Sequence, residues 1–138
     1  MIIADANVVS EFMRDAPDPA VLDWAQTHAT GALGICVVTV EEIERGLARL
    51  PQGRLRRDVT ERWTRLVDAF ADTVAVYDVT AARATAHIRV EAEATGRPMT
   101  LADAQIAGIC LAGDHELATR NTRDFSAVAD LTLINPFG

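Results

Sequence analysis

The chain has 138 residues, 49% of them hydrophobic, and a formal net charge of −7. This length and composition suit one domain with a sizeable core, and no apolar stretch is long enough to suggest a transmembrane span. The excess of negative charge argues against passive binding to a polyanion. Asp5 interrupts the first apolar run, so the N-terminus lacks a signal-peptide pattern and we expect a cytoplasmic protein.

The basic residues are all arginine, and seven of the 13 fall between Arg45 and Arg65. Arginine suits two-pronged contacts with phosphate and carboxylate groups. The cluster is either an ordinary solvated helical face or a docking surface for an acidic partner segment. The two cysteines, Cys36 and Cys110, lie among apolar neighbours, which favours buried thiols over a zinc site.

Short apolar runs alternate with helical patterns in the first half of the chain. The opening "MIIAD" is typical of a buried strand that ends in a carboxylate. "DAPDPAVLDWAQTH" predicts a helix with Asp18 as its cap and Pro19 at its first position. "LGICVV" predicts a second strand, and "TVEEIERGLARL" predicts a helix that "PQG" ends.

The same alternation continues to the C-terminus. An apolar stripe predicts one further helix before residue 71: Leu55, Val59, Trp63, Leu66, Val67 and Phe70. "TVAVYDV" predicts a third strand, and Thr80 can cap a helix that ends near Thr95, before Gly96 and Pro98. "TLADAQIAGICLAG" predicts a very apolar helix, and "HELATR" and "LTLIN" predict two short strands.

This order of elements predicts an α/β fold: a central, mostly parallel sheet of about five strands flanked by helices in an α/β/α arrangement. Ligands of such sheets collect at the carboxyl ends of the strands. Asp5, which follows the first strand, is therefore expected at the functional edge of the sheet.

Three more acidic residues are expected at that edge. Glu42 and Asp103 lie in the predicted first turns of two helices, and Asp124 follows "LATR". Each can have a purely local role, as in the capping-box patterns "TVEE" and "TLAD". Together, however, they repel one another unless a cation neutralises them. Oxygen ligands select a hard ion such as Mg²⁺ or Mn²⁺, which can act on a phosphodiester.

Four segments carry a resemblance to a known family: "IIADANVVSEF", "VTVEEIERGLARL", "TLADAQIAGICLA" and "LATRNTRDF". In this order they resemble PIN-domain ribonucleases, specifically the VapC/FitB-type toxins of bacterial toxin–antitoxin pairs. The resemblance implies a single PIN domain over residues 1–138. It also implies an endoribonuclease that hydrolyses RNA phosphodiester bonds with Mg²⁺-activated water, and a homodimer.

The resemblance also implies which residues form the site. It predicts three acidic residues that are both catalytic and metal-binding: Asp5, Glu42 and Asp103. Two polar residues match family positions beside them: Asn7 and Thr119. Many relatives have an acid where this chain has Asn121, so Asp124 is the candidate for a fourth catalytic acid. Because an amide adds no charge, we expect one tightly bound Mg²⁺ or Mn²⁺.

Residues 41–70 resemble the helical clamp with which the family receives the C-terminal segment of its antitoxin. The implied partners are therefore an RNA substrate and a cognate antitoxin, one of whose arginines reaches the acidic site. We expect part of the apolar stripe to be buried only by that partner. The candidates are Leu47, Leu50, Leu55 and Trp63.

Other readings fit less well. A phosphoaspartate receiver also has an aspartate after its first strand, but it needs a lysine, and this chain has none. A haloacid-dehalogenase-like phosphatase needs a second aspartate where this chain has Asn7. A catalytically weak PIN fold that acts only as a binding module is the remaining alternative, and the retained acids argue against it.

Overall fold

A five-stranded parallel sheet forms the centre of the protein in the computed structural model, which describes residues 1–138. The strands are β1 (Ile2–Ala4), β2 (Leu33–Cys36), β3 (Val74–Ala75), β4 (Glu116–Ala118) and β5 (Leu133–Ile134). They lie in the order β3-β2-β1-β4-β5, and every neighbouring pair is parallel. The strand order therefore reverses at β1, and open parallel sheets bind ligands at such a switch point.

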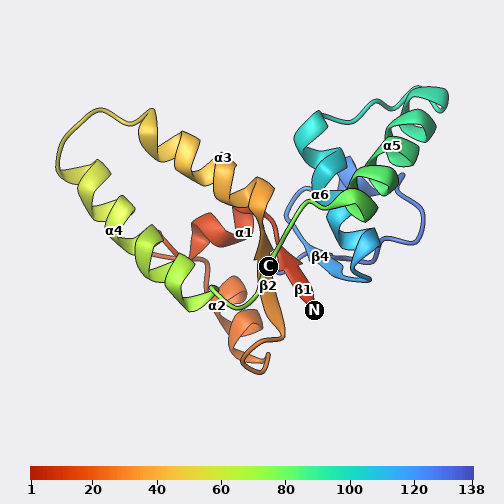
Figure 1. Ribbon diagram of the computed structural model, residues 1–138. Coiled ribbons are helices and arrows are strands. Elements are labelled where there is room, and N and C mark those ends of the chain that lie inside the picture. Colours follow the sequence, from red (N-terminus) through yellow and green to blue (C-terminus); the bar gives the residue numbers. More distant parts are fainter.

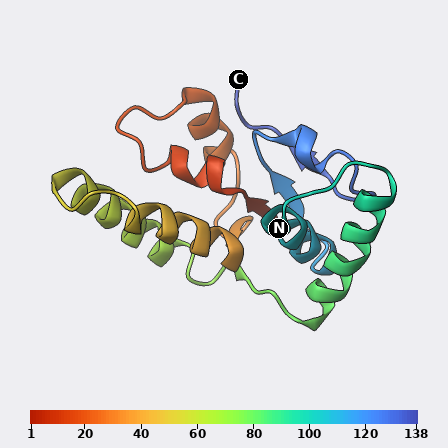
Figure 2. The same ribbon diagram turned by 90° about the horizontal axis from the view of Figure 1, so that it is seen from above.

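Seven helices accompany the sheet. They are α1 (Ala6–Glu11), α2 (Pro19–Gln26), α3 (Val37–Ala48), α4 (Arg54–Ala69), α5 (Val79–Ala94), α6 (Leu101–Ala112) and α7 (Thr122–Phe125). Helices α1 to α4 lie on one side of the sheet and α5 and α6 on the other, with α3 and α4 extending away from it side by side (Figures 1 and 2). This confirms the predicted α/β/α arrangement. None of the helices has the length and apolar character that a membrane crossing requires.

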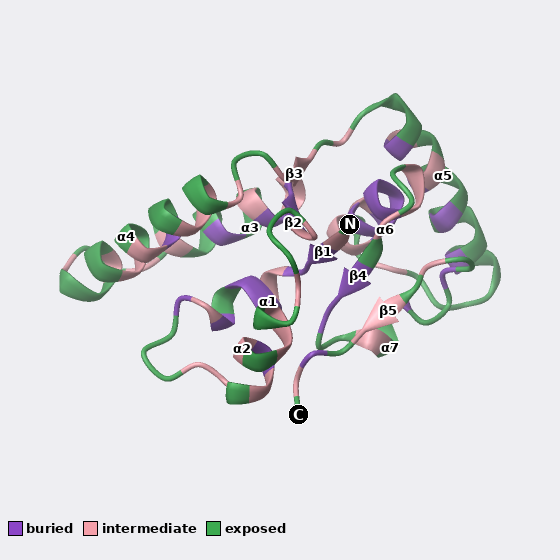
Figure 3. Cartoon of the chain, turned by 90° about the horizontal axis from the view of Figure 1, so that it is seen from below, coloured by how far each residue is buried: buried purple, intermediate pink, exposed green.

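The two faces of the sheet bury different hydrophobic clusters, because successive strand residues point to opposite sides. Ile3 and Leu117 belong to the cluster under α5 and α6, whereas their neighbours Ala4 and Ala118 belong to the cluster under α1 to α4. Buried positions consequently gather along the strands and on the inner faces of the helices (Figure 3). Both cysteines are buried free thiols.

Two predicted helix starts were wrong. Helix α3 begins directly after β2, so Val37 and Val38 are helical and Thr39 lies fully buried inside the helix. The Thr39 hydroxyl contacts the Cys36 sulfur at 3.7 Å and does not cap the helix. Because α3 begins at Val37, Glu42 lies in its second turn rather than its first. Helix α5 is capped by Asp78, whose carboxylate accepts a hydrogen bond from the backbone N–H of residue 81.

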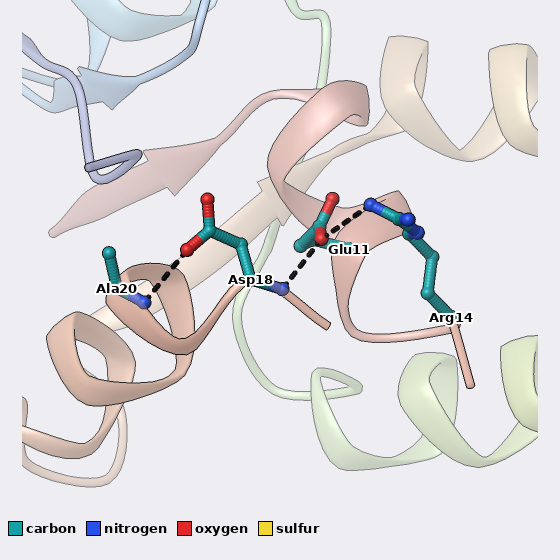
Figure 4. Close-up of polar contacts among 4 residues, drawn as sticks. All are labelled: Glu11, Arg14, Asp18 and Ala20. Carbon is teal, nitrogen blue, oxygen red and sulfur yellow. Dashed lines mark hydrogen bonds and ion pairs between the residues drawn. The ribbon is translucent and has the colours of Figure 1, made fainter. Parts of the chain in front are cut away.

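The loop between α1 and α2 is held by a buried carboxylate. Glu11, 4% exposed, accepts hydrogen bonds from the Asp18 backbone N–H at 2.7 Å and from the Arg14 guanidinium at 2.9 Å (Figure 4). Asp18 in turn caps α2 by accepting from the backbone N–H of Ala20 at 2.9 Å, as its sequence predicted. These contacts fix the C-terminal end of α1, the helix whose first residues lie at the edge of the sheet.

Helix α6 lies unusually close to α5. A Cβ atom added at Gly108 would collide with the Thr85 hydroxyl and would lie 2.8 Å from the carbonyl oxygen of Ala81. Thr85 donates to that same carbonyl at 2.8 Å, so its hydroxyl is satisfied in the interface. The lack of a side chain at Gly108 thus allows α6, which carries Asp103 in its first turn, to pack closely against α5.

Candidate active site

Asp5 stands at the carboxyl end of β1 and is 5% exposed. One carboxylate oxygen accepts a hydrogen bond from the backbone N–H of Ala6 at 2.8 Å, so Asp5 itself caps α1. The other accepts from the Thr119 hydroxyl, also at 2.8 Å. Asp5 is thereby held by groups that follow two neighbouring strands, β1 and β4, at the switch point of the sheet.

Asn7 and Thr119 lie beside Asp5, where the sequence placed them. The Asn7 amide nitrogen lies 3.4 Å from the Thr119 hydroxyl and 3.5 Å from the Asp5 carboxylate. Its amide oxygen accepts from the backbone N–H of Arg120 at 3.1 Å, and the Thr119 hydroxyl accepts from that of Asn121 at 3.0 Å. The network ties the segment after β4 to the start of α1 and orients the buried carboxylate.

The other predicted acids come from helices around this point. Asp103 is half-buried in the first turn of α6, where its backbone N–H donates to the Thr100 cap at 3.2 Å. Glu42 is exposed on α3, and Asp124 is exposed on α7. Asn121 is the residue immediately before α7, is exposed, and makes no side-chain capping bond.

Their charges act on one another. Burial raises the pKa of Asp5, Glu42 and Asp103, and neighbouring negative charges raise them further. Asp5 and Asp103 both act on Glu42, whereas Asp124 acts on both Asp5 and Asp103. Hydrogen bonds from Thr119 and the Ala6 N–H oppose the shift at Asp5. The four acids therefore share one electrostatic environment, as expected for a common edge of the sheet.

This donor set is chemically suited to a hard divalent cation. All candidate side-chain ligands are carboxylate oxygens, and a bound cation would relieve the mutual repulsion that adds to the effect of burial on their pKa values. The side chains do not yet converge, since no group of three His, Cys, Asp or Glu residues lies close enough to hold one ion. Glu42 is exposed on α3 and Asp103 is half-buried on α6.

Two cavities adjoin the carboxylates. The first, which we call the apolar cavity, has a volume of about 680 Å³, lies among α1, α3 and α4, and includes Glu42, Leu47, Leu50, Leu55 and Val59 in its lining. The second, the arginine cavity, has a volume of about 310 Å³ and contains two acids and two arginines in its wall: Asp103, Asp124, Arg97 and Arg123. No sequence motif pointed to these arginines, although both lie within six residues of a predicted site acid.

The helices α3 and α4 differ in part from expectation. Trp63 is only 4% exposed and its indole N–H donates to Glu44 at 3.3 Å. The prediction that Trp63 is buried only by a partner chain was therefore wrong. Leu55 is 66% exposed, and Leu47 and Leu50 are half-buried. An apolar surface therefore remains on this pair of helices, on the side that faces the apolar cavity.

Comparison with known proteins places this architecture in a family. The family model described as "PIN domain" matches residues 2–131. Three curated relatives each cover 99% of this chain. They are plasmid stability protein StbB of Pseudomonas syringae (38% identity, 99% of its length), VapC ribonuclease Y4jK of Sinorhizobium fredii (36%, 98%) and toxin FitB of Neisseria gonorrhoeae (31%, 99%).

The fold agrees with a solved structure as well. The crystal structure of FitAcB from Neisseria gonorrhoeae superposes with a TM-score of 0.90 at 31% identity, covering 99% of this chain and 98% of the other. Family model, sequence relatives and fold agree over nearly the whole length. The chain therefore belongs to the PIN-domain family.

Proposed function

We propose that the protein is a metal-dependent endoribonuclease, the toxin of a VapBC-type toxin–antitoxin pair. The observation that carries this proposal is the set of acids at the switch point of the sheet: Asp5, Glu42 and Asp103 have raised pKa values, and negative charges of this set, including Asp124 on α7, contribute to the increase. The relatives named VapC ribonuclease and toxin FitB support both parts of the proposal.

Asp5, Asp103 and Glu42 would hold Mg²⁺ or Mn²⁺, with Asp5 and Asp103 as the direct ligands. When bound, the ion would supply positive charge that activates water and stabilises the phosphodiester during hydrolysis. Thr119 and the Ala6 N–H keep Asp5 oriented and favour its ionised form. Glu42 is exposed and has a raised pKa, which suits a group that accepts a proton during the reaction.

The same proposal includes a protein partner. The apolar cavity joins Glu42 to the exposed side of α3 and α4, so an apolar segment lying in it would end beside the carboxylates. We assign this surface, within residues 41–70, to the antitoxin as a helical clamp. An arginine at the end of such a segment would pair with the carboxylates. A single PIN domain over residues 1–138 that forms a homodimer completes the proposal.

A PIN-fold binding module without nuclease activity is the second candidate. The observation that favours it is the lack of three side chains converging on one point. The two candidates differ in one measurable respect, because only the nuclease needs the charge of Asp103.

The test is RNA cleavage in Mg²⁺, Mn²⁺ and EDTA by the unaltered protein, Asp103→Asn and the control Asp23→Asn. Asp23 is an exposed aspartate on α2 that does not line either cavity beside the acids. We expect cleavage to require the metal, to be lost in Asp103→Asn and to be retained in Asp23→Asn. Full cleavage by Asp103→Asn in metal-free buffer would overturn the mechanism, and no cleavage under any condition would favour the binding module.

A further inference from the structure

The two cavities beside the carboxylates differ in whether the arginines that line them are paired with other groups of the chain. In the apolar cavity, Arg14 pairs with Glu11 at 2.9 Å, and Arg62 pairs with Asp15 at 2.5 Å while also donating to the carbonyl oxygen of Met13 at 2.8 Å. Both guanidinium groups in this cavity are therefore already engaged within the chain.

In the arginine cavity, by contrast, the two arginines are not paired within the chain. Arg97 lies in the loop before α6 and Arg123 lies on α7, and both side chains are exposed. Neither guanidinium takes part in any of the three ion pairs of the protein or in a side-chain hydrogen bond. The neighbouring Arg120 differs, since its guanidinium lies 3.7 Å above the Phe137 ring.

An RNA backbone needs such free cations at this place. The protein carries a net charge of −7, and Asp103 and Asp124 line the same cavity as the two arginines. A phosphate approaching these carboxylates is repelled by them, even after one cation has been bound. Two guanidinium groups in the same cavity as the acids would offset this repulsion and could hold phosphate oxygens by paired hydrogen bonds. The volume of about 310 Å³ is sufficient for a small ligand group.

We propose that Arg97 and Arg123 bind a backbone phosphate of the RNA next to the bond that is cut. This inference rests on the proposed ribonuclease function and adds the direction of approach. RNA reaches the carboxylates through the arginine cavity on the α6 and α7 side, whereas the apolar cavity on the α3 and α4 side receives the protein partner. The two ligands then meet only at the carboxylates.

The experiment measures the salt dependence of RNA binding. Arg97→Ala, Arg123→Ala and the double variant are made in an Asp103→Asn background, so that a fluorescent oligouridine stays intact. Arg89→Ala, which removes an exposed arginine on α5 outside the cavity, is the control. A single-stranded backbone contact contributes about 0.7 to the slope of log K against log salt concentration, so each variant should lower the slope by about that amount and raise Kd several-fold.

With Asp103 restored, the same variants should raise KM for RNA while leaving kcat close to that of the parent, because a backbone contact holds substrate and transition state alike. Salt slopes equal to that of Arg89→Ala would overturn this inference while the ribonuclease assignment stands. RNA binding that depends on the arginines without any cleavage by the parent would instead overturn the ribonuclease. Unchanged slopes combined with weakened binding of a poly-glutamate peptide would assign the arginines to an acidic protein segment and overturn the RNA contact.

Discussion

Thr119, at the end of β4, donates a 2.8 Å hydrogen bond to Asp5, at the end of β1. Thr119 is completely buried and Asp5 is 5% exposed, so this bond is shielded from bulk water. Burial raises the pKa of Asp5 and the hydroxyl lowers it. The threonine hydroxyl thus favours the charged form of a buried carboxylate at the switch point of the sheet.

Replacing Thr119 with valine should remove that support with little change in volume. The Asp5 carboxylate and the Asn121 backbone N–H both lose a partner, and we expect the free energy of unfolding to fall by about 1–3 kcal/mol. The pKa of Asp5 should rise, moving the acidic limb of the cleavage–pH profile to higher pH. Thr119→Ser, which retains the hydroxyl, is the control. A valine variant with the parent's pH profile would show that the hydroxyl does not set the charge of Asp5.

The acids should also make metal-free stability depend on pH. The pKa values of Asp5, Glu42 and Asp103 are raised in the folded state, so the folded protein binds more protons than the unfolded chain at pH values above the usual carboxyl pKa of about 4. The free energy of unfolding in EDTA should therefore fall as the pH rises from about 4 towards neutrality. Urea titrations at these pH values measure it.

Asp103→Asn should weaken this dependence and melt at a higher temperature than the parent in EDTA at neutral pH. Saturating Mg²⁺ should reduce the dependence in the parent by neutralising the carboxylates. A parent stability that rises with pH over this interval would contradict the mutual repulsion.

A substitution at Asn121 can test how many metal ions the site binds. The Asn121 backbone N–H bonds to the hydroxyl of Thr119, which in turn bonds to Asp5, so position 121 lies close to the buried carboxylate. We expect one tight Mn²⁺ site in the parent and stronger binding in Asn121→Asp, because the substitution adds a negative charge near the ion. Calorimetric titration measures both quantities. Gln52→Glu adds the same charge in the loop between α3 and α4 and should change nothing. Two tight sites in the parent would contradict the expectation.

The antitoxin surface can be mapped by hydrogen exchange. Binding of the cognate antitoxin should protect backbone amides around Leu47, Leu50 and Leu55, which line the apolar cavity. Leu55→Arg should weaken binding with little effect on stability, since Leu55 is 66% exposed in the free chain. Val90→Arg, at a 65% exposed position on α5, is the matched control. The absence of protection throughout residues 41–70 would assign the antitoxin to another surface.

Features of the structure that depend on neighbouring residues in the sequence were predicted better than features that depend on tertiary contacts. The Asp18 and Thr100 caps and the strand before Asp5 depend on neighbours along the chain, and they were predicted correctly. The start of α3 was missed because Val37 and Val38 extend the β-branched run of β2, yet they are helical and pack against the cluster under α5 and α6. Here tertiary burial overrides local propensity.

In the site, too, features set by the order of the elements were predicted, whereas contacts between distant residues were missed. The carboxylates were placed at one edge because parallel strands and the helices after them meet there. The burial of Trp63 was missed because its partner, Glu44, lies on the neighbouring helix, and nothing in the spacing of the two residues reveals that contact. The arginine cavity was missed for a related reason, since Arg97 and Arg123 come together only when α6 and α7 fold against each other.

The separation of the two hydrophobic clusters by the sheet has a mechanical consequence. Glu42 lies on the part of α3 that packs with the cluster under α1 to α4, next to Ile43, and Asp103 belongs to α6, which packs with the cluster on the opposite face. A cation shared by these two carboxylates would cross-link the layers above the sheet. Metal-loaded protein should then unfold more cooperatively than protein from which the metal has been chelated.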